Sequence, residues 1–138
     1  MIMPVGSNKE DLKARDALIT SFYVEWNRNN PEHRVFNHDL NDYIHVTYLS
    51  LDETRRHAAK RPQSTLAVLQ LDTILRTAKR VGKPLPVKPG SRNQKNFSKM
   101  LRMECQLEDI GMVKLLVGIK KKTGELVQYC ITSIEPLQ

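Results

Sequence analysis

The sequence lacks any apolar run that approaches the roughly 20 residues needed for a membrane-spanning helix. Its first residues also lack the cationic start and the apolar stretch of a secretory signal peptide. These two absences predict a cytoplasmic protein that has no membrane partner.

Cysteine is scarce, with Cys105 and Cys130 as the two examples. Both fall in predicted strands, and we expect two reduced, buried side chains, while their spacing leaves a disulfide between them open. The four histidines form no recognisable metal-ligand spacing with these cysteines. The sequence therefore predicts no metal site and no cofactor.

Acidic residues are absent between Asp72 and Glu104, an interval that contains nine lysines and arginines. The whole chain has a net charge of +7. Unbalanced cations over a helix end, a loop and a strand create a positive potential that attracts phosphates. The candidate contacts are Arg76, Lys79, Arg80, Lys88, Arg92, Lys95 and Lys99 in this interval and Gln128 in the last strand. The expected partner is nucleic acid or an acidic protein, and a solvated polar loop is the alternative interpretation.

Aromatic residues make up 6% of the chain, and within the basic interval Phe97 is the only one. Surfaces that bind single strands by stacking combine cations with several aromatic rings. Sequence-specific recognition through stacked bases is therefore disfavoured.

The apolar pattern predicts one α+β domain over residues 1–138. Apolar residues at helical spacing predict helices over 7–30, about 51–60 and about 64–81, and the run from Ser50 to Glu53 has the pattern of a capping box for the second. Short strands are expected at 35–36 and 43–48. The order is an N-terminal helix, short strands, two helices, and then a three-stranded antiparallel meander, with the helices packed on one face of the sheet.

The meander comprises a strand over 97–107 and a ribbon over 113–134 that turns at Gly124. In the expected register Lys114 lies across from Thr132 and Gly118 from Gln128, on the face opposite the helices. A glycine there allows close approach of a ligand, and the polar residues around it are candidates to hold a phosphate. The alternative is a sheet face that is polar because it is solvated.

Four segments resemble one nuclease superfamily: HAAKRP at 57–62, LDTIL at 71–75, VGIKKKTG at 117–124 and QYCITS at 128–133. Together with the order of elements, they resemble the barnase, EndoU, colicin and RelE superfamily, and within it the nuclease-like, large polyvalent protein-associated domains of phages and mobile elements. The similarity covers about 43–134 as a nuclease-like core, with 1–30 as a peripheral helix.

The resemblance implies RNA cleavage without a metal, with RNA ahead of DNA as the partner. Such chemistry needs a group that titrates near neutrality and fixed cations. The candidate catalytic residues are His57, Arg61, Lys114 and Thr132, with His57 as the acid or base. A non-catalytic module that binds nucleic acid or protein with the same fold is the alternative, because no carboxylate is recognisable as a partner of His57.

Overall fold

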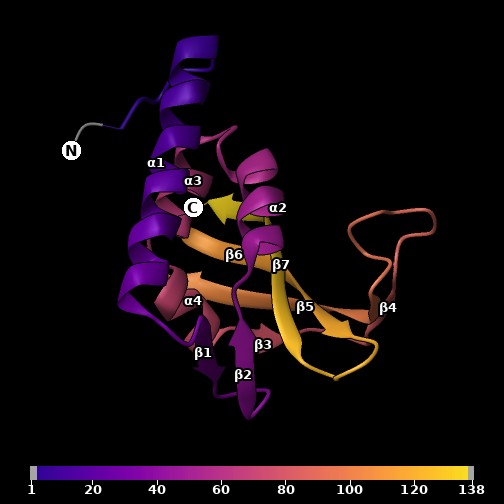
Figure 1. Ribbon diagram of the computed structural model, residues 1–138. Helices are drawn as coiled ribbons and strands as arrows, with labels where there is room; N and C mark the ends of the chain where they lie inside the picture. The colour runs from indigo at the N-terminus through magenta and orange to yellow at the C-terminus, as the bar shows by residue number, and fades with distance from the viewer. Residues whose placement is uncertain (1–2, 137–138) are drawn as a thin grey trace.

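The computed structural model describes residues 3–136, which form four helices and a curled, mixed sheet of seven strands, an α+β fold as the sequence predicts (Figure 1). The helices are α1 (Lys9–Asn29), α2 (Tyr48–Ala58), α3 (Pro62–Val68) and α4 (Leu71–Thr77). The strands are β1 (Arg34–Asn37), β2 (Asp42–His45), β3 (Lys79–Arg80), β4 (Leu85–Pro86), β5 (Phe97–Leu107), β6 (Gly111–Lys120) and β7 (Leu126–Pro136).

The sheet has the order β1-β2-β7-β6-β5-β3, with β4 also paired to β5. The predicted antiparallel meander is present as β5, β6 and β7. The sheet is nevertheless mixed, because β2 runs parallel to β7 and pairs Ile44 with Leu126 and His45 with Val127. This parallel pairing ends after two residues, so beyond it the edge of β7 that faces away from β6 borders helix α2 instead of another strand (Figure 1).

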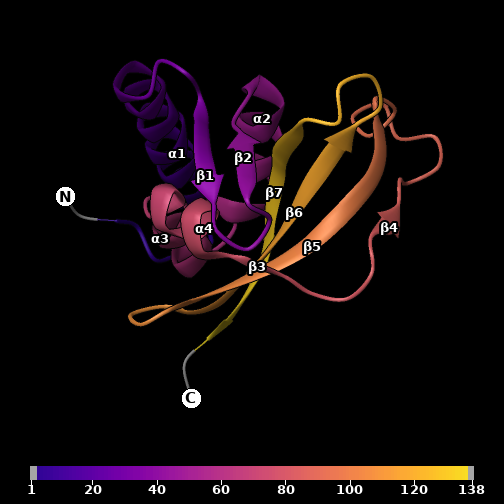
Figure 2. The ribbon, with the colours of Figure 1, turned by 90° about the horizontal axis from the view of Figure 1, so that it is seen from below.

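The helices pack on one side of the sheet, and β4 with the loop that follows it lies on the other side (Figure 2). The main hydrophobic core lies beneath the helices and includes Ile19, Tyr23 and Trp26 of α1. A second, smaller core contains Phe97, Met100, Val127, Tyr129 and Cys130, with partly buried side chains of β4 and its loop packed against it. Both faces of the meander are therefore covered, and the second face is not a solvated surface.

Helix α2 begins three residues earlier than the sequence pattern suggests. The expected capping box from Ser50 to Glu53 is wrong, because Thr47 is the N-cap and its backbone N–H donates to the Ser50 hydroxyl at 2.9 Å. The strand expected to reach Tyr48 ends at His45 for the same reason. Glu53 is thereby one and a half turns inside the helix and takes no part in capping.

The single helix expected over about 64–81 is two short helices, α3 and α4, followed by strand β3. The chain breaks helical geometry at Gln70, and the side chain of Leu66, which would lie among the apolar residues of a single helix, is 42% exposed. Packing of Ala67 and Val68 against the core determines which face of α3 is buried. Helical periodicity across the break was therefore misleading.

The ribbon pairs β6 with β7, but not in the expected register. Lys114 pairs with Ser133 instead of Thr132, and Gly118 with Val127 instead of Gln128. Two irregularities interrupt the ladder, one at Tyr129 and one at Thr132, and neither of these residues has a register partner on β6. A β-bulge of this kind re-aims side chains at a sheet edge.

Gly118 permits a close approach, as expected, but the approaching group belongs to this chain. A Cβ atom at Gly118 would lie 2.7 Å from Cδ1 of Phe97. The ring of Phe97 in turn meets Tyr129 edge to face, with 6.1 Å between centroids. The glycine therefore accommodates the second core and no ligand.

Candidate functional site

Two hollows of the molecule adjoin along β7. One, of about 440 Å³, lies between the end of α2, the start of α3 and the end of β7. The other, of about 610 Å³, lies between α2, β7 and the loop 87–96 that joins β4 to β5. His57 and Thr132 line both hollows, so together they form one continuous depression, which we call the groove.

Helix α2 contributes Glu53 and His57 to one wall of the groove. Residues four apart on a helix lie on the same face, so these two side chains are neighbours along the wall. Glu53 is 6% exposed, whereas His57 is exposed to solvent. The wall thus combines a nearly buried carboxylate with an accessible imidazole.

Strand β7 supplies the floor of the groove through its two bulges. Tyr129 and Cys130 are consecutive, yet both belong to the second core, and Thr132 and Ser133 are consecutive, yet both line the first hollow. A regular strand points successive side chains to opposite faces. The bulges therefore present more polar side chains to the groove than a regular strand of this length does.

The loop 87–96 forms the opposite wall and is held by its own polar side chains. Gln94 is buried and accepts a hydrogen bond from the backbone N–H of Lys88 at 2.6 Å. The Asn93 amide donates to Oε1 of Glu53, which links the loop to α2. The exposed Lys88 and Arg92 side chains line the groove from this wall.

Burial determines the protonation state of Tyr129 and Cys130 in the floor of the groove. Burial raises the pKa of the Cys130 thiol to about 12, and the nearby charge of Glu53 adds to the effect. Burial also raises the pKa of the Tyr129 phenol; hydrogen bonding with Gln94 opposes the increase and the charge of Glu53 adds to it. Both groups therefore keep their protons near neutral pH, and Cys130 is no nucleophile.

Several sequence-predicted residues meet in the groove. His57, Arg61 and Thr132 line the first hollow, and Lys88 and Arg92 join His57 and Thr132 in the second. These residues come from α2, the start of α3, the loop 87–96 and β7, which are far apart in the sequence. Three of the four candidate catalytic residues and two of the candidate phosphate contacts thus share one depression.

Lys114 and Gln128 lie elsewhere. The Lys114 ammonium forms an ion pair with Glu135 at 2.5 Å, and this hydrogen bond and charge raise its pKa. It lines neither hollow of the groove. Gln128 is fully buried beneath the helices, where it accepts from the Tyr23 hydroxyl at 3.0 Å and donates to Thr54. Its expected contact with a phosphate does not fit this position, because the bulge at Tyr129 changes the register.

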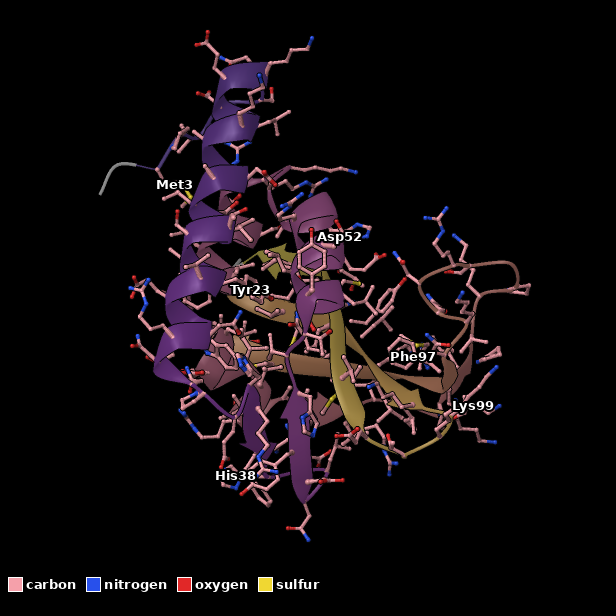
Figure 3. The ribbon with its side chains drawn as sticks, viewed as in Figure 1. Met3, Tyr23, His38, Asp52, Phe97 and Lys99 are labelled. Atoms are coloured by element: carbon pink, nitrogen blue, oxygen red, sulfur yellow. The ribbon has the colours of Figure 1, made fainter. Side chains whose placement is uncertain are left out.

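The basic interval is divided between two regions of the molecule. One region is where α4 and β3 approach β1, and it contains Arg76, Lys79 and Arg80. There the backbone N–H of Arg80 donates to the Asp39 carboxylate, and Lys79 is the register partner of Glu104 on strand β5. Lys95 follows the groove residues in the loop, and Lys99 lies beside β4 (Figure 3). The cations therefore do not form a single stripe.

Sequence reasoning missed Glu53 and Tyr129. The available signal for Glu53 was its position four residues before His57, but the capping interpretation assigned its carboxylate to the helix end. Tyr129 packs in the second core at 6% exposure while also lining the groove. No local pattern predicts the bulge that re-aims it.

Within residues 3–136 no cluster of histidine, cysteine, aspartate and glutamate side chains has the makings of a metal site. In the same part of the chain no helix combines the length and the apolar character that crossing a bilayer requires. Both cysteines are buried free thiols.

Comparison of the chain with protein-family models, with curated proteins and with solved structures finds no match.

Proposed function

We propose that the groove binds RNA and cleaves it without a metal ion. The observation that supports this proposal is the combination of two proton-transfer groups, Glu53 and His57, on one wall with cations on the others. Arg61, Lys88 and Arg92 have no ion-pair partner among residues 3–136, so they are available to a phosphate. Pairing of cations with a phosphodiester is the electrostatic basis of nucleic-acid affinity.

The proposed reaction needs two proton transfers. A base removes the proton of the ribose 2′-hydroxyl, whose oxygen bonds to the adjacent phosphorus while the bond from phosphorus to the 5′-oxygen breaks. An acid returns a proton to that leaving oxygen. The products are a 2′,3′-cyclic phosphate and a free 5′-hydroxyl. Glu53 and His57 supply the acid and base pair.

The cations of the groove and the Tyr129 hydroxyl stabilise negative charge. The guanidinium and ammonium groups of Arg61, Lys88 and Arg92 oppose the charge that develops on the phosphoryl oxygens. The Tyr129 hydroxyl stays protonated because its pKa is raised, so it is a hydrogen-bond donor to the same oxygens. The Thr132 hydroxyl already donates to the Lys114 carbonyl at 3.1 Å, so toward a ligand it serves as an acceptor.

The test is cleavage of a labelled single-stranded RNA by the full chain in excess EDTA, with the cyclic phosphate identified by mass spectrometry. His57→Ala and Glu53→Gln are each expected to slow cleavage by roughly 10²-fold or more, the usual size of a general acid or base contribution. A 2′-deoxy substitution at the scissile nucleotide must block the reaction.

The matched control is His38→Ala, because His38 is an exposed histidine at the β1 end of the molecule, outside the groove (Figure 3). It is expected to cleave as the unchanged chain does. Equal cleavage by all variants would attribute the activity to a contaminating nuclease. RNA binding without turnover would instead favour the non-catalytic module.

A further inference from the structure

The turn between β6 and β7 lies against the loop 87–96 at the end of the groove's outer wall. The backbone N–H of Lys121 donates to the Asn96 carbonyl at 2.9 Å, and Lys120 pairs with Phe97 across the strands. Figures 1 and 2 show this turn and the loop on the same side of the molecule, away from α1. The turn therefore extends the basic wall of the groove.

Five lysines gather at this junction, and we call them the basic tip: Lys95, Lys99, Lys120, Lys121 and Lys122. None of their side chains has a hydrogen-bond or ion-pair partner within residues 3–136. The acidic residue of the same turn, Glu125, points its carboxylate to His45 at 3.3 Å. The positive charge of the tip is therefore not neutralised by the turn itself.

Some cations elsewhere in the described chain are neutralised by a carboxylate. Arg28 pairs with Glu25, Arg55 with Asp16, and Lys114 with Glu135. At the tip, by contrast, like charges crowd together, which opposes the compact state unless an anion is bound. The tip also has a hollow of about 410 Å³, lined by Lys120, Lys121 and Lys122 together with Asn96 and Thr123. Ammonium, amide and hydroxyl groups are the donors that phosphate oxygens accept from.

We propose that the basic tip is a second phosphate-binding surface, which holds the strand that flanks the nucleotides in the groove. This inference rests on the proposed function for the class of ligand, and it adds that the substrate is an extended single strand that contacts both surfaces. The tip contacts the phosphates of the RNA and not its bases. Its binding is therefore expected to be independent of the nucleotide sequence, because lysine contacts to phosphate do not distinguish bases. The nearest aromatic ring, Phe97, is buried at 2% exposure and is not available for stacking.

The experiment measures binding of a fluorescently labelled 20-nucleotide oligouridylate by anisotropy at several salt concentrations. The variant K120Q/K121Q/K122Q removes three charges from the tip. Each lost phosphate contact to a single strand reduces the slope of log affinity against log salt by about 0.7, so the slope is expected to decrease by about 2. The control variant R76Q/K79Q/R80Q removes the same charge from the β1 end and is expected to keep the slope.

Short and long substrates separate this inference from the proposed function. The K120Q/K121Q/K122Q variant is expected to cleave a dinucleotide, which fills the groove alone, at the unchanged rate. His57→Ala is expected to lose cleavage while keeping the salt slope of the 20-mer. If the tip variant shows the expected decrease in salt slope for the 20-mer, but the unchanged chain never cleaves RNA, the result would support the basic tip and refute the catalytic proposal.

Two outcomes would overturn the basic tip as a strand-binding surface. One is an equal change of slope in the tip variant and the control variant, because the effect would then be net charge alone. The other is displacement of the 20-mer by poly-glutamate as efficiently as by unlabelled RNA of equal length, which would assign the tip to an acidic protein. Equal binding of a deoxy 20-mer supports the tip, since lysines do not distinguish the sugars.

Discussion

The Asn93 amide nitrogen donates a hydrogen bond to Oε1 of Glu53 and so connects two groove walls that are forty residues apart in the sequence. The loop that contains Asn93 also contains Lys88 and Arg92, and the helix that contains Glu53 also contains His57. This hydrogen bond therefore contributes to the position of the phosphate-binding cations relative to the proton-transfer groups.

Replacing Asn93 by alanine is expected to loosen the loop without unfolding the protein. A hydrogen bond to a charged group contributes about 1.5–3 kcal/mol, and exposure of the freed carboxylate recovers part of this. Amide hydrogens of 88–96 are expected to exchange faster, and RNA affinity to fall several-fold. The control is Asn29→Ala, an exposed amide at the end of α1. Unchanged exchange in the loop would show that Asn93 does not hold it.

Gly118→Ala is expected to destabilise the fold by about 1–3 kcal/mol, since the added methyl group overlaps the Phe97 ring in a packed core. Urea denaturation measures the change. If the ring is the cause, Phe97→Leu combined with Gly118→Ala costs less than the sum of the two single changes. Strict additivity in this double-mutant cycle would place the cause elsewhere.

Arg15→Met is expected to reduce the free energy of unfolding by about 3 kcal/mol, because buried carbonyls lose their donor. Arg15 is fully buried and donates to the carbonyls of Pro4, Ala59 and Lys60. The bonds to Ala59 and Lys60 tie α1 to the turn that leads into the groove.

Arg15→Lys is not expected to restore the stability, since an ammonium does not reproduce the guanidinium fork. The control for Arg15 is Lys13→Met, which removes an exposed cation from the same helix and is expected to change stability little. A Lys variant as stable as the unchanged chain would contradict the requirement for three directed donors.

Stability is expected to fall as the pH rises above about 9. Burial raises the pKa of Cys130 from 9.0 to about 12 and that of Tyr23 from 10.0 to about 12. In this window the unfolded chain releases protons that the folded chain keeps, so the unfolding free energy decreases, by at most about 1.4 kcal/mol per pH unit for each group. Urea midpoints at pH 7.5, 9 and 10.5 measure the slope.

Cys130→Ala is expected to flatten the part of that slope nearest pH 9, where the thiol is the group that titrates first in the unfolded chain. Cys105→Ala keeps Cys130 and is the matched control, because it removes the other buried thiol. A stability that stays constant to pH 10.5 in the unchanged chain would show that neither group resists ionisation in the fold.

The elements with strong periodicity were predictable. Alternating apolar residues gave β5 and the ribbon, Gly124 has the positive φ of 74° that the turn requires, and α1 extends from Lys9 to Asn29 within the expected range. The two free, buried cysteines are also as expected. In these segments the local pattern and the packed core favour the same structure.

The candidate site was only partly predictable. His57, Arg61, Lys88, Arg92 and Thr132 were recognisable as polar or cationic residues of suitable types, and all of them line the groove. Glu53 and Tyr129 escaped notice because their roles depend on where α2 begins and on a bulge in β7. Neither the start of α2 nor the bulge in β7 changes the periodic pattern of apolar residues in the sequence.

By itself the sequence determined the class of fold, the meander and the excess of positive charge, because these depend on residue type and on short-range spacing. Tertiary structure alone decided that the basic interval divides into two regions, that Gln128 is buried, and that Glu53 faces the loop 87–96. The physical reason is register: a one-residue bulge exchanges the faces of a strand, and its position is selected by packing between segments that are distant in the chain.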